Sequence, residues 1–222
     1  MTVHLRFLDF LMSAIYDTAD LHPEHLADLG KSGLTSETIR RQKIRSVPPD
    51  MFERLLGYSP PRAVRSMMLI PYFDAAGALM PHVRAKIFPP ITDGADGHTI
   101  KYLQPRGSAI RVFFPLATLA EVLEGDGPLL VCEGEKKALA IGQRGLPVIG
   151  IAGIEAWHAR GARTLLPDFA PIRLMGRVVE IVPDSDFRTN RTVEQAVSGL
   201  ATALAVRGAR ARVVVLPDAV PA

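Results

Sequence analysis

From about residue 115 onward, short apolar runs alternate with amphipathic segments, and this alternation constrains the fold more than any other feature. The apolar runs have the length of buried strands, and they lie at 128–132, 147–151, 177–182 and 211–216. The segments with helical spacing lie at 116–123, 135–144 and 193–207. Because alternating strands and helices build a parallel sheet, we predict an α/β domain at 115–217 whose parallel sheet is flanked by helices.

The residues before this domain predict two further parts. Residues 1–60 contain short helical segments, and Thr35 or Ser36 is suited to cap the segment that begins at residue 37. Residues 61–114 predict an antiparallel α+β part that begins with a hairpin. Its strands are expected at 67–73, 79–88, 100–103 and 110–114.

Composition excludes several classes of protein. Hydrophobic residues make up 48% of the 222 residues and the net charge is only +3, which excludes a disordered chain. Cys132 is the only cysteine, so a disulfide scaffold and a cysteine-based zinc ribbon are excluded. No apolar run reaches the roughly 18–20 residues of a membrane span, and we expect a soluble, cytoplasmic protein. His82, His98 and His158 lack metal-ligand spacing and are expected at the surface.

Acidic residues follow two of the predicted strands. Glu133 and Glu135 come directly after the first strand, and Asp184 and Asp186 follow the third. Ligands of parallel sheets bind beyond the carboxyl ends of the strands, and clustered carboxylates repel one another unless a cation lies among them. Helix capping is the alternative role for each acid alone. Two acidic clusters in one sheet favour a Mg²⁺ or Mn²⁺ site of Glu133, Asp184 and Asp186, within about 10 Å of one another.

Basic residues predict a path for a nucleic acid or nucleotide. The candidates are Arg84, Lys86, Lys101, Arg106, Lys136, Lys137 and Arg188. Those in the antiparallel part are interleaved with Tyr102, Phe113 and Phe114, which offer stacking surfaces to a single strand. The alternative is a solvated sheet face above core aromatic residues, because neighbouring residues of a strand point to opposite faces.

The acidic motifs and their flanks resemble the TOPRIM domain of primases. Glu133-Gly134-Glu135 is followed by Asp184-x-Asp186, and the two motifs are 184 − 133 = 51 positions apart. Residues 130–135 are similar to the glutamate motif of phage primase-helicases, and 147–153 resemble the next strand and turn.

Upstream residues resemble the polymerase core of bacterial-type (DnaG) primases. Residues 69–74 with Gly77, and later 101–103, correspond to its Phe-Pro strand, Asp-x-x-Gly turn and Lys-Tyr-Leu element. Residues 32–40 and 133–137 resemble a TOPRIM-like domain of unknown function in phage and plasmid replication proteins. The resemblance covers about residues 22–217.

The resemblance implies a Mg²⁺-dependent nucleotidyltransferase of DNA primase type in phage or plasmid replication. Glu133 would be a metal ligand or acid/base, Asp184 and Asp186 would hold one or two Mg²⁺, and Lys101 would face nucleotide or template. Implied partners are single-stranded DNA, nucleoside triphosphates and a replicative helicase, with no membrane. The role of Glu135 is not assigned.

Two other functions stay open from the sequence. A TOPRIM nuclease uses the same three acids to cut phosphodiesters with water. A non-catalytic module would bind nucleic acid or nucleotide for a partner helicase. The chain has no P-loop pattern, so no helicase is expected within it, and the missing zinc ribbon leaves template recognition to other residues.

Overall fold

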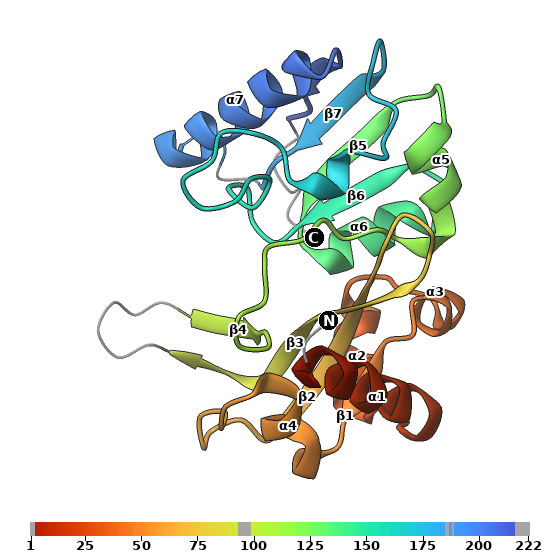
Figure 1. Ribbon diagram of the computed structural model, residues 1–222, viewed down its shortest axis with the longest axis vertical. Coiled ribbons are helices and arrows are strands. Elements are labelled where there is room, and N and C mark those ends of the chain that lie inside the picture. The colour runs from red at the N-terminus through yellow and green to blue at the C-terminus, as the bar shows by residue number, and fades with distance from the viewer. Residues whose placement is uncertain (1–2, 93–98, 185–186, 188, 216–222) are drawn as a thin grey trace. The chain divides into compact units, whose positions relative to one another are not determined.

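The computed structural model describes residues 3–92, 99–184, 187 and 189–215, with side chains from residue 10 on. The chain forms two compact units (Figure 1). The first contains residues up to 73 together with 78–109, and the second contains 74–77 together with the residues from 110 on. Each unit has its own apolar core. The predicted combination of an antiparallel part with a parallel α/β part is confirmed.

The first unit is built on an antiparallel sheet of order β1-β2-β3-β4. Its strands are β1 (Arg45–Val47), β2 (Ser66–Phe73), β3 (Leu79–Thr92) and β4 (Thr99–Leu103). The pairing of β2 with β3 confirms the predicted hairpin. The three-residue strand β1 was not predicted, because so short a run has no readable period.

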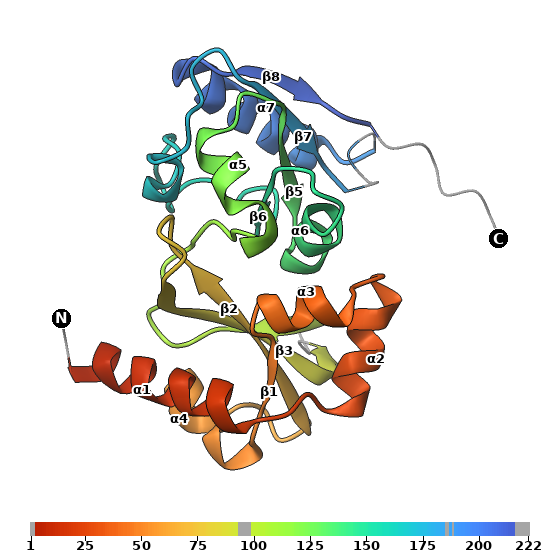
Figure 2. The same ribbon diagram turned by 90° about the vertical axis from the view of Figure 1, so that its right-hand side faces the viewer.

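Helices cover both faces of this sheet (Figure 2). They are α1 (Val3–Thr18), α2 (Pro23–Lys31), α3 (Ser36–Arg41), the 3-10 turn η1 (Pro49–Met51) and α4 (Phe52–Leu56). α1 and α4 pack their apolar residues against the face that carries Met67 and Leu69. α2 lies over the opposite face, where its His25 contacts Ser46 and Ser66. The predicted Thr35 cap is confirmed, since its hydroxyl accepts the N–H of Thr38.

The second unit is built on a parallel sheet of order β6-β5-β7-β8. Its strands are β5 (Leu129–Glu133), β6 (Val148–Ile151), β7 (Val178–Val182) and β8 (Arg210–Val213). The other elements are η2 (Leu116–Thr118), α5 (Leu119–Glu124), α6 (Glu135–Gly142), η3 (Pro167–Phe169) and α7 (Arg191–Val206). α7 covers one face through Val197 and Leu200, and α6 covers the other through Ala138 (Figure 2).

Residues 110–114 do not form the expected strand of the antiparallel part. Phe113 instead makes an antiparallel bridge to Gly150 at the free edge of β6. The N–H of each residue donates to the carbonyl of the other, at 2.8 and 2.9 Å. A β-carbon on Gly150 would lie 3.1 Å from Cβ of Ala138 and 3.3 Å from Cβ of Phe113. Glycine therefore permits this segment to close the edge of the second sheet.

His82 also differs from its predicted surface position. The side chain is buried on β3, and its ring meets the Tyr72 ring edge-on with 4.5 Å between centroids. His98 lies outside the described residues. Packing against the Tyr72 ring thus contributes to the burial of this histidine.

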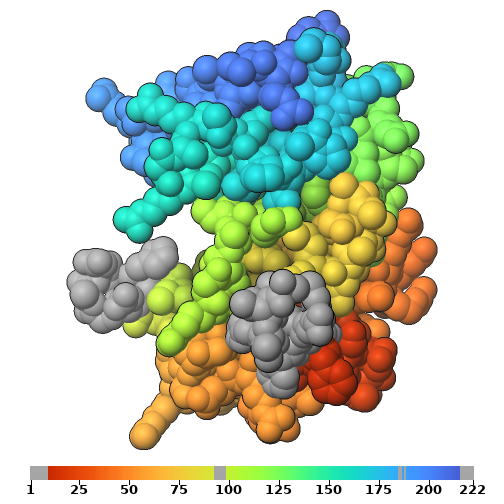
Figure 3. Space-filling model, in the orientation of Figure 1, coloured from red at the N-terminus to blue at the C-terminus, as the bar shows by residue number. Residues whose placement is uncertain are grey.

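The loop after β6 covers one side of α7 (Figure 3). Its Trp157 is 5% exposed, and a β-carbon on Gly199 would lie 3.1 Å from the indole ring. The helix can approach this ring closely because position 199 has no side chain.

The longest described helices, α1 and α7, have 16 residues each. The buried residues of α7 recur at helical spacing and join the core of the second unit, as in any helix with one apolar face. Among the helices of the described residues, none combines the length and the apolarity that crossing a bilayer requires.

Arg177 fastens the start of β7 to the end of α5. Its side chain is buried and donates to the carbonyl oxygens of Glu121, Val122 and Gly127 at 2.5–2.8 Å. Burial lowers the pKa of this guanidinium from its ordinary value. Five N–H donors in one planar fork allow a single side chain to satisfy three carbonyl groups.

We expect Arg177→Leu to lower the free energy of unfolding by about 2–4 kcal/mol, because it leaves buried carbonyl groups without donors. Urea denaturation followed by circular dichroism measures the change. The matched control is Arg173→Leu, which removes only an exposed ion pair with Asp126 and should cost less than about 1 kcal/mol. Equal losses of unfolding free energy in the two variants would contradict the role of Arg177 as the donor to these carbonyl groups.

Candidate active site

Glu133 is the last residue of β5, the strand that lies between β6 and β7. In the parallel register, Glu133 lies beside Ile151 of β6, and Cys132 lies beside Val182 of β7. The carboxyl ends of the three strands are therefore level with one another. Asp184 comes two residues after the end of β7, at the same edge of the sheet as Glu133.

The Glu133 carboxylate joins the loops that follow its two neighbouring strands. Its Oε1 accepts the backbone N–H of Asp184 at 3.1 Å, and its Oε2 accepts the backbone N–H of Ile154 at 3.1 Å. Two N–H donors on different oxygens fix the plane of the carboxylate. Each oxygen keeps further lone-pair capacity, because an ionised carboxylate has about four acceptor sites.

Asp184 is the second carboxylate at this edge, and it forms an ion pair with Lys137 of α6. Both side chains are largely exposed, at 46% for Asp184 and 55% for Lys137. An ion pair this exposed contributes about 0–1 kcal/mol to stability. Lys137, predicted as a phosphate-binding residue, therefore lies directly beside the acids.

Burial raises the pKa of Glu133 above its ordinary value, and the negative charge of Asp184 acts in the same direction. The backbone N–H groups of Asp184 and Ile154 and the ammonium of Lys137 oppose this rise. Because the pKa of Glu133 rises overall, these N–H groups and the ammonium do not fully replace the water that burial removes from its carboxylate. Positive charge at this edge would therefore be stabilising.

Gly134 makes the turn from β5 into α6. Its φ of 82° and ψ of 148° belong to a region that is open essentially to glycine alone. Its N–H donates to the carbonyl of Ile151 at 2.7 Å, so the turn is tied to β6. Glu135, whose role the sequence left unassigned, follows it and is 2% exposed. Lys136 is half-buried in the same turn of α6.

A cavity of about 410 Å³ adjoins Asp184, between α6 and the ends of β5 and β7. Its lining is apolar apart from the charged pair, and consists of Cys132, Lys137, Ala140, Ile141, Val182, Pro183 and Asp184. Burial raises the pKa of the Cys132 thiol to about 12, so this side chain stays a neutral thiol at neutral pH. The site thus combines carboxylate oxygens, one exposed ammonium group and a mainly apolar cavity.

Two predicted site residues, Asp186 and Arg188, lie outside the described residues. The structure brings Glu133 and Asp184 together, and the third acid stays a prediction.

The basic residues of the antiparallel sheet occupy both of its faces. Arg84 lies over the ring of Tyr102, 4.4 Å from its centroid, and Lys86 is paired with Tyr102 across the strands. The Lys86 ammonium lies 2.5 Å from Asp28 of α2. Lys101 is exposed and adjacent to Tyr102 in β4, which directs its side chain to the opposite face.

Arg106 is exposed beyond β4, with its guanidinium 6.0 Å from the ring centroid of Tyr58. Lys101 and Arg106 belong to the first unit, whereas Glu133 belongs to the second. Their proximity to the acids stays a prediction.

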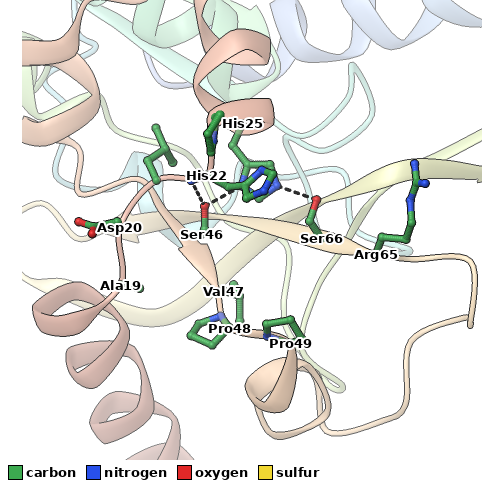
Figure 4. Close-up of a pocket in the computed structure, with 12 residues that line it drawn as sticks. Ala19, Asp20, His22, His25, Ser46, Val47, Pro48, Pro49, Arg65 and Ser66 are labelled. Carbon is green, nitrogen blue, oxygen red and sulfur yellow. Dashed lines mark hydrogen bonds between the residues drawn. The ribbon is translucent and has the colours of Figure 1, made fainter.

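Sequence analysis missed a polar cluster in the first unit. His22, Glu24 and His25 lie at the start of α2, and the His25 ring lies between the hydroxyl groups of Ser46 and Ser66 (Figure 4). The available signal was the run His22-Pro23-Glu24-His25, which has three metal-ligating side chains within four positions.

Solved structures with the same fold are primase catalytic cores. A primase of Aquifex aeolicus, comprising zinc-binding and RNA polymerase domains, superposes with a TM-score of 0.67 at 15% identity, over 97% of this chain. The RNA polymerase domain of Mycobacterium tuberculosis primase DnaG gives 0.65 at 14% identity, over 98% of this chain and 76% of that one. A DnaG catalytic domain bound to single-stranded DNA gives 0.61 at 19% identity, over 97% and 73%.

These similarities establish the fold of a DnaG primase catalytic core. The chain spans 56% of the length of the Aquifex primase structure. Residues 120–220 match a family described as a domain of unknown function (DUF3854), and this region includes Glu133 and Asp184. A comparison with curated proteins finds no match.

We expect Glu133→Gln to destabilise the second unit by about 1–3 kcal/mol, because one backbone N–H loses its acceptor and faces an amide NH₂ instead. Asp184→Asn should leave stability close to that of the wild type, since it removes an exposed ion pair but relieves repulsion of Glu133. Urea denaturation in metal-free buffer compares the two. A larger loss in Asp184→Asn than in Glu133→Gln would contradict the bonding described for Glu133.

Proposed function

We propose that this protein is a metal-dependent nucleotidyltransferase of DNA primase type that acts on single-stranded DNA. The observation that carries the proposal is the convergence of Glu133 and Asp184 at the ends of adjacent parallel strands, within the fold of a primase catalytic core. The order and flanks of the acidic motifs, which resemble TOPRIM primases, support the same function.

The acids fit a hard divalent cation such as Mg²⁺ or Mn²⁺. Carboxylate oxygens are the ligands that these ions prefer, and Glu133 keeps acceptor capacity beyond its two backbone bonds. Glu133 and Asp184 would hold the ion, and we propose Asp186 as a third ligand. When bound, such an ion activates the attacking 3′-hydroxyl and neutralises triphosphate charge.

The protein's own residues supply orientation and further positive charge. The N–H groups of Ile154 and Asp184 hold the Glu133 carboxylate in one plane, so little reorganisation is needed when a ligand arrives. The Lys137 side chain is exposed enough to exchange Asp184 for a phosphate oxygen. The start of α6 follows Glu133 closely, and the positive end of the helix dipole favours anions there. We propose that Lys136 and Arg188 also bind phosphate.

We propose that the template strand follows the basic residues of the first unit. Arg84 over Tyr102 and Arg106 over Tyr58 combine a guanidinium with an aromatic ring, as single-strand binding surfaces do. Lys101 adds an exposed charge on the other face of β4, and because β4 is an edge strand we propose that the template passes around this edge. Lys86 is engaged by Asp28 and contributes less. The DnaG catalytic domain bound to single-stranded DNA has the same fold.

Residues 32–40 and 133–137 resemble a domain of phage and plasmid replication proteins, and this resemblance extends the proposal to the biological process. It favours phage or plasmid replication in the cytoplasm, with nucleoside triphosphates as substrates and a replicative helicase as partner. A metal-dependent nuclease would use the same acids, and the experiment below separates it by its product.

The ion pair between Lys137 and Asp184 supports a second candidate function. Because the Lys137 ammonium already balances the charge of Asp184, this acid does not need a metal ion for charge neutralisation. A module that binds single-stranded nucleic acid without catalysis is consistent with that arrangement.

Incubation with single-stranded DNA, labelled nucleoside triphosphates and Mg²⁺ or Mn²⁺ tests the proposal. We expect new oligonucleotides from the wild type and a loss of about a hundredfold or more with Asp184→Asn, because a metal ligand is removed. The control is Asp126→Asn, an exposed acid paired with Arg173, which should retain activity. Shortened DNA would indicate a nuclease instead. DNA binding without either product would indicate the non-catalytic module.

We expect Lys101→Ala to weaken binding of single-stranded DNA and to reduce the slope of log affinity against log salt by about one. Fluorescence anisotropy over a salt series measures both quantities. Lys31→Ala, an exposed lysine at the end of α2, is the control that should leave the slope unchanged. Unaltered affinity in Lys101→Ala at low salt would remove this residue from the proposed path.

A further inference from the structure

The cluster at the start of α2 has the donors and the spacing of a transition-metal site. His22, Glu24 and His25 each offer one ligand atom, and these atoms all lie within 4.8 Å of one another. Two imidazole nitrogens and one carboxylate oxygen are a ligand set that Zn²⁺ uses with an open fourth position. The hard oxygen ligands of the strand-end acids, by contrast, suit Mg²⁺.

The hydrogen bonds around His25 determine which ring nitrogen carries the proton. The Ser66 hydroxyl donates to Glu24 Oε2 at 3.1 Å, so its oxygen can only accept from His25 Nε2, 3.0 Å away. Nε2 therefore carries the proton, and Nδ1 accepts from the Ser46 hydroxyl at 2.7 Å.

Nε2 of His25 and the Glu24 carboxylate thus approach the same point in space. The Ser66 hydroxyl occupies that point, 3.0 Å from one and 3.1 Å from the other. A metal ion there would replace the hydroxyl as the bridge between them. When Nε2 of His25 binds the ion, the ring proton must move to Nδ1. The Ser46 hydroxyl can then accept the Nδ1–H and so act as the outer hydrogen-bond partner that metal-bound histidines require.

His22 contributes one ring nitrogen to this cluster. Its Nδ1 accepts the N–H of Glu24 at 3.3 Å, which leaves Nε2 for a ligand. Its ring centroid lies 5.4 Å from that of His25. A tetrahedral ion separates its ligands by about 3.4 Å, so the donors must close by up to about 1.4 Å. His22 and Glu24 are exposed, and rotation of their side chains can supply this movement.

We propose that His22, Glu24 and His25 form a Zn²⁺-class metal site in the first unit, separate from the strand-end acids. A pocket of about 490 Å³ adjoins the two histidines and the two serines, so a water molecule or small ligand can reach the fourth position (Figure 4). With an ion bound, His25 would still be linked to Ser46 of β1 through Nδ1, so the site would stay joined to the sheet at that residue. The site is independent of the proposed primase function.

Titration of the tag-free protein with Co²⁺ tests the site, because a tetrahedral site gives strong visible absorption that Zn²⁺ then abolishes. We expect one Co²⁺ per chain, and affinity reduced about tenfold or more by His22→Ala and by Glu24→Gln. Both side chains are exposed, so both variants should fold. His158→Ala is the matched control, since His158 lies in the second unit, where it contacts Glu155, Trp157 and Ala159.

The strand-end acids need a second control, because carboxylates also bind Zn²⁺. Asp184→Asn should leave the Co²⁺ spectrum and affinity unchanged. Zn²⁺ should also raise the thermal midpoint of the wild type more than that of His22→Ala, because a ligand that binds only the folded state stabilises it. Absent binding, equal affinity in His22→Ala and wild type, or a loss confined to Asp184→Asn would each overturn the proposal.

Discussion

The second unit depends on one carboxylate that serves as a backbone acceptor. Glu133 ends the strand between β6 and β7, and it receives an N–H group from the loop that follows each of them. Backbone donors in such partly buried loops must be satisfied, and here one side chain satisfies two. The positions of Ile154 and Asp184 therefore both follow from Glu133. The acid that we propose as a metal ligand therefore also holds the loops on both sides of it.

That arrangement has an electrostatic cost, which other residues offset. Asp184 adds a like charge beside a carboxylate that is already half-buried. Lys137 reaches back from α6 to Asp184, and Gly134 allows α6 to begin directly after Glu133. The charge of Asp184 at this edge is consequently balanced by Lys137. The edge can still accept a cation, because the Lys137 ammonium is exposed and can move away from Asp184.

The sequence predicted much of this arrangement, and its failures have physical causes. Period and length were sufficient for the parallel sheet, since buried strands and amphipathic helices differ strongly in pattern. The lateral order β6-β5-β7-β8 leaves no trace in periodicity, so the backbone bonds of Glu133 could not be foreseen. Segment 110–114 bridges to β6 because of Gly150, a tertiary effect. The histidine cluster had a local signal in residues 22–25, but the contacts of His25 with Ser46 and Ser66 arise only when β1 and β2 pair.

The turn at 74–77 belongs to the second unit, although the strands on both sides of it belong to the first. Neither unit is therefore an uninterrupted stretch of sequence. A single recombination event near residue 110 would transfer the family-matched region 120–220 but leave that turn behind. A fragment that begins near residue 110 would likewise lack this turn, and its stability would measure what these four residues contribute to the unit.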